Sequence, residues 1–194
     1  MPWAFKENRP IFQQICDMIV IRILNGTYPM GSKLPSVREM AEEAGVNPNT
    51  MQRAMSHLEE KGLAITNRTS GRTVTTDEEL LKRTKREYAV AAAEDFLQEM
   101  KKLENIVIYN PDNEYGPLTF NDREVFSQDA AGYLASKDIA VRSGNHCAKI
   151  LHGIIGTDST IRASLYFYNT KEEVDRCVKA CSEISLENAV GIFF

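Results

Sequence analysis

Residues 45–61, GVNPNTMQRAMSHLEEK, combine amide, hydroxyl and guanidinium side chains at helical spacing. Asn47 can cap a helix that begins at Pro48, where the missing N–H of proline costs nothing. One stripe of the helix is apolar and consists of Met51, Ala54, Met55 and Leu58. The polar residues lie around the rest of the turn: Asn49, Thr50, Gln52 and Arg53. Amides pair with adenine edges and guanidinium groups with guanine edges or phosphates. The stretch is therefore interpreted as a DNA-reading helix, although a solvated surface helix has the same pattern.

The segments before this stretch supply the rest of a helix-turn-helix. Apolar residues at helical period after Pro10 predict a first helix that ends near Asn25, and residues 28–35 read as a loop because they contain three Pro or Gly residues. Ser36 then caps a short helix over residues 37–44, with Glu39 as its capping-box partner. Gly45 ends that helix, so two short helices are separated by a tight turn.

After Gly62, residues 63–66 and 72–76 alternate apolar and polar side chains on either side of residues 67–71, NRTSG. This pattern predicts two strands joined by a turn. Arg68 and Arg72 would lie at the tip of the hairpin. The order of helix, helix-turn-helix and hairpin is that of a winged helix.

Residues 34–74, LPSVREMAEEAGVNPNTMQRAMSHLEEKGLAITNRTSGRTV, resemble the winged-helix domain of the GntR family of bacterial transcription regulators. The resemblance runs over about residues 9–76 and implies a dimer that binds a palindromic operator in double-stranded DNA. Pro48 stands where many relatives have Arg or Ser, and Gln52 where some have Arg, so the base preference cannot be transferred. The DNA-binding residues that we expect on this basis are Ser36, Arg38, Asn47, Asn49, Thr50, Gln52, Arg53, Arg68, Gly71 and Arg72.

Residues 77–103 lack proline and glycine and are rich in Ala, Glu, Lys and Leu, which predicts a long helix or a helix pair. Within the GntR family this segment resembles the short-tailed YtrA-like group, in which helices after the wing make the dimer. We therefore expect residues 77–105 to be a helical linker and dimerisation segment, without a large effector domain behind it.

The remaining residues, 106–194, change in character. Strands are expected at 106–109, 118–120, 139–141 and 161–167, and helices at 129–136, 147–155 and 171–185. Residues 185–194 are expected to be a tail with an apolar end. The whole chain is thus predicted to be an α+β protein: an N-terminal winged helix-turn-helix over 1–76, the helical linker, and a small C-terminal α+β domain over 106–194.

Two runs in this last part, DIAVRSGNHCA at 138–148 and IRASLYFYNT at 161–170, resemble the C-terminal portion of a cysteine desulfurase of the pyridoxal-phosphate-dependent, class V aminotransferase type. The resemblance spans about residues 104–186. It implies that Cys147 would correspond to the cysteine that takes sulfur as a persulfide and Arg162 to the arginine that holds the substrate carboxylate. We expect His146 and the start of a helix beside Cys147 to favour the thiolate.

The part of that family that carries the cofactor is missing from the resemblance, because a winged helix stands where it would be. No lysine lies in the setting of a Schiff base, so we expect no cofactor and no enzyme activity, with Cys147 and Arg162 as vestigial candidates only. Cys177 and Cys181, one helical turn apart, are interpreted as core residues rather than metal ligands, and no metal is expected.

Charge and composition bound the possible partners. Residues 1–76 carry 9 Lys and Arg against 7 Asp and Glu, and the full chain has a net charge of -4, so DNA affinity would rest on placed cations. The N-terminus lacks the apolar run of a secretory signal, and no stretch resembles a membrane span. A cytoplasmic protein with reduced thiols is expected.

Three hypotheses remain open at this point. The first is a dimeric DNA-binding transcription regulator, with an unknown small-molecule or redox effector. The second is a sulfur-accepting or thiol-sensing protein that uses Cys147 and lacks desulfurase activity of its own. The third is that the two resemblances meet at an accidental or artificial junction near residues 102–106.

Overall fold

A computed structural model of the chain describes Trp3, Phe5, Glu7 and residues 9–67, 71–112 and 116–191. The chain forms two compact units, Met1–Lys85 and Arg86–Phe194, which are treated separately below. Helix and strand are mixed, as the predicted α+β class requires. Among the described residues, none of the helices is both long and apolar enough to cross a bilayer.

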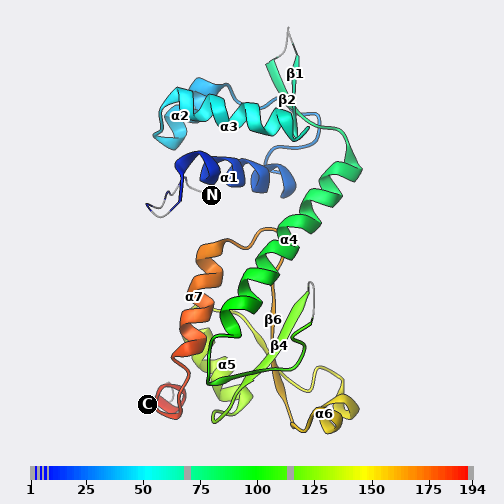
Figure 1. The fold of residues 1–194 in the computed structure, drawn as a ribbon, viewed down its shortest axis with the longest axis vertical. Coiled ribbons are helices and arrows are strands. Elements are labelled where there is room, and N and C mark those ends of the chain that lie inside the picture. The colour runs from blue at the N-terminus through cyan, green and yellow to red at the C-terminus, as the bar shows by residue number, and fades with distance from the viewer. Residues whose placement is uncertain are drawn as a thin grey trace. The chain divides into compact units, whose positions relative to one another are not determined.

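The first unit contains three helices followed by a two-stranded antiparallel sheet (Figure 1). Their bounds are α1 (Ile11–Leu24), α2 (Val37–Ala44), α3 (Pro48–Glu60), β1 (Ala64–Asn67) and β2 (Gly71–Val74). The helix α4 (Glu78–Met100) follows and begins in this unit. The predicted winged helix is therefore confirmed, and residues 77–103 contain one long helix rather than a pair.

Local capping chemistry sets the bounds of α2 and α3. The Ser36 hydroxyl accepts a hydrogen bond from the Glu39 amide at 3.2 Å, while the Glu39 carboxylate accepts one from the Ser36 amide at 2.7 Å. Gly45 ends α2 at φ +64°, a left-handed conformation that glycine adopts without strain. Asn47 Oδ1 then accepts from the Asn49 amide at 2.8 Å, and Pro48 occupies the first helical position. These features were all predicted from the sequence.

The core of the first unit lies where α1 and α2 pack against α3. Fully buried side chains from all three helices meet there and exclude water: Ile15, Ile19, Met40, Met51, Met55 and Leu58. Because burying apolar surface is the dominant favourable term in folding, this contact fixes the angle at which α3 leaves the turn.

Residues 31–34, which the sequence analysis assigned to a loop, bind the backbone of β2 in the wing. Within the wing, β1 and β2 pair from Ala64↔Val74 to Asn67↔Gly71. The Gly31 amide donates to the Val74 carbonyl at 3.2 Å, and the Leu34 amide donates to the Arg72 carbonyl at 2.9 Å. Residues 31–34 are therefore held against β2 like a short third strand, because their backbone groups find partners there.

The second unit is built on a four-stranded antiparallel sheet with the order β3-β4-β6-β5. Its strands are β3 (Ile106–Ile108), β4 (Pro117–Asp122), β5 (Arg142–Gly144) and β6 (Thr160–Ser164), and its helices are α5 (Ser127–Ser136), α6 (Lys149–Ile155), α7 (Lys171–Ser182) and α8 (Leu186–Val190). α5 contacts β4, β5, β6, α7 and α8. The core joins the C-terminal part of α4 to this sheet through Phe96, Met100, Phe120, Leu134 and Ile161.

Three sequence predictions in this unit were wrong in position. Residues 139–141 are not a strand, because Asp138 adopts φ +59° and the Ile139 amide bonds back to the Leu134 carbonyl at 3.0 Å. This Schellman closure of α5 directs the chain away from the sheet until β5 begins at Arg142. The helix predicted from Cys147 begins at Lys149, and part of the expected tail forms α8.

Candidate nucleic-acid interface

The reading helix α3 presents its polar side chains on the face opposite the core. Five polar residues at this helix are expected to contact DNA. Thr50 is half-buried, and the other four are exposed: Asn47, Asn49, Gln52 and Arg53. Met51, Ala54, Met55 and Leu58, which alternate with them, are buried. The structure therefore gathers these residues on one side of a single helix, as the sequence pattern predicted. A helix of this kind fits the major groove of B-DNA.

Within this face, two amides already have local hydrogen bonds. The Asn47 oxygen accepts the bond that starts the helix, so a contact with a base would use its amide nitrogen. The Gln52 Nε2 group donates to the Ser56 hydroxyl, one turn later, at 3.3 Å. This bond orders the Gln52 side chain along the helix surface.

The Arg53 guanidinium is positioned by an aromatic side chain from α1. Its Cζ lies 4.5 Å from the centroid of the Phe12 ring. The His57 ring, one turn along α3, contacts the same Phe12 ring edge-on, with 5.7 Å between the two ring centroids. A cation over an aromatic face is attracted by the ring quadrupole, so Phe12 restricts the orientations of Arg53. Sequence reasoning missed Phe12, although its helical spacing from Ile15 and Ile19 placed it on the side of α1 that faces α3.

The wing is attached to α3 through one carboxylate. Arg72 Nε donates to Glu59 Oε1 at 2.5 Å, and the Thr66 hydroxyl donates to the same oxygen. The pKa of Glu59 is lowered below its ordinary value even though burial opposes this, because both hydrogen bonds and the Arg72 charge favour the carboxylate. Arg72, which we expected to contact DNA, is thus paired with Glu59 in the DNA-free protein. Glu59 was not among the residues singled out from the sequence.

Between the wing and the start of α2 lies an open groove. Its lining includes Lys33, Ser36, Glu39, Gly71 and Arg72. The groove therefore brings together three residues that the sequence analysis selected and adds Lys33, which it overlooked because residues 28–35 were read only as a loop. Lys33 Cε lies 3.6 Å from the position that a Cβ of Gly71 would occupy.

Two arginines complete the predicted set. Arg38 is exposed on α2, between Val37 and Glu39, which both line the groove. Arg68 lies outside the residues that the structure describes. Gly71, at φ +84°, begins β2 in a conformation that other residues rarely adopt. The contacts of all these residues with DNA remain predictions.

Two further residues selected from the sequence, Cys147 and Arg162, lie in the second unit. Cys147 is exposed in a turn, closed by the Ala148 amide donating to the Asn145 carbonyl at 2.7 Å, in which His146 and Cys147 both have positive φ. Arg162 lies in β6, opposite Arg142 of β5.

His146 does not supply the positive charge that we expected beside Cys147. Burial lowers the pKa of His146 below its ordinary value, so the imidazole is neutral near neutral pH. Its Nε2 donates to the Thr160 carbonyl at 3.0 Å. The ring is therefore held against β6 as a neutral group.

The lysines of the second unit are all exposed to solvent. They are Lys101, Lys102, Lys137, Lys149, Lys171 and Lys179. The most constrained of them, Lys171, lies 3.6 Å from Asp95 and 3.3 Å from Asp175 and is held by these carboxylates. Among the described residues of this unit, no group of three or more His, Cys, Asp or Glu is arranged to hold a metal ion.

Comparison with known proteins divides the chain into two matches. Residues 11–74 match the bacterial regulatory proteins of the gntR family, and residues 71–177 match the class-V aminotransferases. A GntR family transcriptional regulator from Listeria monocytogenes has a similar structure, with 40% sequence identity, a TM-score of 0.50, and coverage of 52% of this chain and 89% of that one.

Two similar curated proteins are named probable cysteine desulfurases. The protein of Ureaplasma parvum serovar 3 is 49% identical over 78 residues, which is 40% of this chain and 19% of that protein. The protein of Staphylococcus aureus strain COL is 41% identical over 88 residues, which is 44% of this chain and 21% of that protein. The chain thus spans about a fifth of the length of these curated relatives. The two family matches meet at residues 71–74, upstream of the junction that the sequence suggested.

Proposed function

The chain belongs to the class-V aminotransferase family through residues 71–177 and carries a gntR-family regulatory domain at residues 11–74, and we propose that the regulatory domain determines its function. The protein is then a DNA-binding transcription regulator. It reads sequence with α3 and steadies itself on the phosphate backbone with the wing. Half or more of the hydrogen bonds in such complexes go to phosphate and sugar, and base edges supply the specificity.

The observation that carries this proposal is the exposed polar face of α3. Asn49, Gln52 and Arg53 project from a helix whose opposite side is fixed by a buried core. Amide and guanidinium groups on a rigid helix can make the paired hydrogen bonds that distinguish adenine and guanine in the major groove. Arg38 and Lys33, both exposed, can neutralise phosphates beside the groove at the wing.

We propose further that the protein binds a palindromic operator as a homodimer. A single module buries a smaller interface with DNA, and a two-fold dimer doubles the contact and matches a palindromic site. The proposed place of dimerisation is the middle of α4, a long helix after the wing, where Tyr88 and Val90 are half-buried and Ala91 is exposed. The two reading helices of such a dimer would lie about 34 Å apart, one turn of DNA.

A selection experiment tests this proposal. The protein is incubated with random duplex DNA, bound sequences are recovered over several rounds, and the mass of the complex is measured by light scattering. We expect enrichment of an inverted repeat whose half-sites are centred about one helical turn apart, bound by two chains. Binding that shows no sequence enrichment, or one chain per enriched site, would contradict it.

We propose no desulfurase activity for this chain. Pyridoxal phosphate is held as a Schiff base of a lysine enclosed with the cofactor, and the exposed lysines of the second unit do not fit that role. The chain also spans only about a fifth of its desulfurase relatives. Sulfide released from L-cysteine by the purified chain supplied with pyridoxal phosphate, together with aldimine absorbance, would contradict this proposal.

A further inference from the structure

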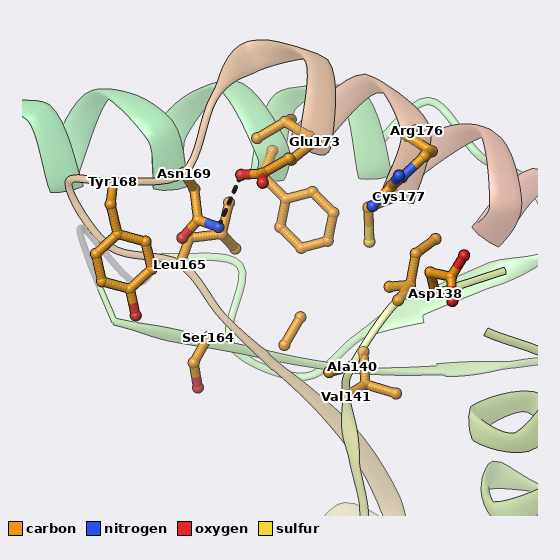
Figure 2. Close-up of a pocket in the computed structure, with 14 residues that line it drawn as sticks. Asp138, Ala140, Val141, Ser164, Leu165, Tyr168, Asn169, Glu173, Arg176 and Cys177 are labelled. Atoms are coloured by element: carbon orange, nitrogen blue, oxygen red, sulfur yellow. Dashed lines mark hydrogen bonds between the residues drawn. The ribbon is translucent and has the colours of Figure 1, made fainter. Parts of the chain in front are cut away.

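A cavity in the second unit lies between α7, the C-terminal part of α4, residues 138–141 before β5, and residues 163–165 at the end of β6 (Figure 2). Its volume is about 290 Å³, at the lower end of the roughly 300–1,000 Å³ of small-molecule sites. Apolar side chains form most of its walls: Phe96, Ile139, Val141, Ala163, Leu165 and Val174. Polar side chains stand around them, among which Asn169 and Glu173 are joined by a hydrogen bond of 3.3 Å. The cavity therefore suits a small and largely apolar molecule.

The cavity exists because two neighbouring strands part. Pairing between β5 and β6 ends at Arg142↔Arg162, whereas β6 continues beside β4 as far as Ser164. The Schellman closure at Asp138 carries residues 139–141 away from β6, and the space so opened is covered by α7. The opening is thus a consequence of backbone geometry rather than of one side chain.

A thiol lines this space. Cys177, in the middle of α7, is half-buried and belongs to the cavity wall, where Figure 2 shows it beside Arg176. Cys181, one turn later, is buried in the core. A hydrogen bond from the Cys181 thiol lowers the pKa of Cys177, against the effect of burial and with help from the Arg176 charge. The same pairing, together with burial, raises the pKa of Cys181.

The other described thiols are placed differently. Cys16 is buried in the first unit, and burial raises its pKa to about 11. Cys147 is exposed but does not line the cavity. Cys177 is therefore the one cysteine of the described chain that combines access from a cavity with a second thiol one helical turn away.

We propose that Cys177 is a covalent modification site for small, neutral α,β-unsaturated carbonyl compounds seated in this cavity. The Cys177 thiol gives its proton to water, and the sulfur attacks the β-carbon, so a carbon–sulfur bond forms as the carbon–carbon π bond breaks. The electron pair moves onto the carbonyl as an enolate, whose α-carbon then takes the proton back from water. The net change is addition of the thiol across the double bond, with no oxidant or second reactant. Apolar walls favour the neutral body of the reagent, and Arg176 at the rim offers a cation for the developing oxyanion.

Reagents of two sizes test the site in the full chain. N-ethylmaleimide at limiting amounts is a small, neutral acceptor of this type, and mass spectrometry of peptides gives the rate at each cysteine. We expect Cys177 to react several-fold faster than Cys147 with N-ethylmaleimide, and Cys147 to react faster with a maleimide carried on a long polyethylene glycol chain. The proposal is overturned if Cys147 reacts first with both reagents, or if Cys177 reacts no faster than the buried Cys181.

Variants separate the cavity from the thiol pair. Ala140→Leu fills the cavity from an exposed position and should slow the reaction at Cys177 while Cys147 keeps its rate. Cys181→Ala removes the hydrogen-bond donor and should slow Cys177, whereas Cys181→Ser keeps a donor and should restore most of the rate. If Ala140→Leu leaves the rate at Cys177 unchanged, the cavity is not the route of access and the proposal fails.

If Cys177 reacts at the same rate in Cys181→Ala and in Cys181→Ser, the role assigned to Cys181 as hydrogen-bond donor is wrong. An unchanged circular dichroism spectrum shows that each variant is folded.

Discussion

Arg72 Nε lies 2.5 Å from Glu59 Oε1, so the first residues of β2 are tied to the last turn of α3. The two side chains are only 19% and 29% exposed. Thr66 of β1 donates to the same carboxylate oxygen, and therefore both strands of the wing are attached to the reading helix through Glu59. The wing and α3 would then approach DNA as one rigid surface, and Arg72 acts first as the residue that positions the wing.

Glu59→Gln should weaken DNA binding although it removes a negative charge. The charge-assisted hydrogen bond to Arg72 is lost, so the wing becomes more mobile. The DNA-binding free energy should weaken by roughly 1 kcal/mol, which corresponds to about a fivefold lower affinity. Gel shift gives the affinity, and hydrogen exchange at β1 and β2 gives the mobility. Glu60→Gln, on the same helix turn, controls for net charge. A rise in affinity in Glu59→Gln would instead mean that Arg72, once released, binds phosphate more strongly than it positions the wing.

Arg53 should carry sequence discrimination rather than general affinity. Arg53→Ala is expected to cost about 1–3 kcal/mol in the difference between a matched and a mismatched duplex if the guanidinium meets a base edge. Arg53→Lys is the matched control, because it keeps the charge but loses the planar fork and its stacking on Phe12. Binding to both duplexes is measured at several salt concentrations. Equal weakening on both duplexes would assign Arg53 to phosphate.

The sequence was sufficient for the first unit because its signals are local. Ser36 with Glu39, Gly45, and Asn47 with Pro48 each determine the geometry of a few neighbouring residues, and the structure follows them. The contact between Arg72 and Glu59 could not be foreseen in the same way, because it joins residues 13 positions apart in different elements. Such pairs depend on the tertiary placement of the wing.

In the second unit, local pattern reading failed where tertiary geometry decides. Ile139 to Val141 have the apolar composition of a strand, but the left-handed Asp138 closes α5 and diverts them. Sequence reasoning also chose Cys147 from a family resemblance and assigned Cys177 to the core. It could not reveal the cavity beside Cys177, which arises from the parting of β5 and β6.

Asn47 should have two separable roles, capping α3 and contacting DNA. Asn47→Asp keeps the oxygen that accepts the Asn49 amide but places a negative charge where the phosphates approach, so stability should be retained and DNA affinity lost. Asn47→Ala removes the cap and should lower the free energy of unfolding by about 1 kcal/mol. Thermal unfolding followed by the single tryptophan, Trp3, and gel shift distinguish the two effects. If Asn47→Asp binds DNA as well as the native protein does, the proposed contact is wrong.

His146 should make the second unit sensitive to acid. Burial lowers its pKa below the ordinary value, and the charges of Arg162, His152 and Arg142 lower it further, although the bond to the Thr160 carbonyl acts the other way. The unfolded chain therefore takes up this proton more readily than the folded chain does. The stability associated with neutral His146 is present above the unfolded-state pKa of about 6.5 and is lost as the pH falls below it.

His146→Gln should reduce this sensitivity, because glutamine can still donate to the Thr160 carbonyl but cannot take up a proton. Hydrogen exchange of β5 and β6, corrected for the intrinsic effect of pH, is compared at about pH 7.5 and about pH 5.5, on either side of the ordinary histidine pKa. The native protein should lose protection at the lower pH, and the variant should lose less. His57→Gln, in the first unit, should leave the response of β5 and β6 as it is in the native protein. Equal losses of protection in the native protein and in His146→Gln would show that another group is responsible.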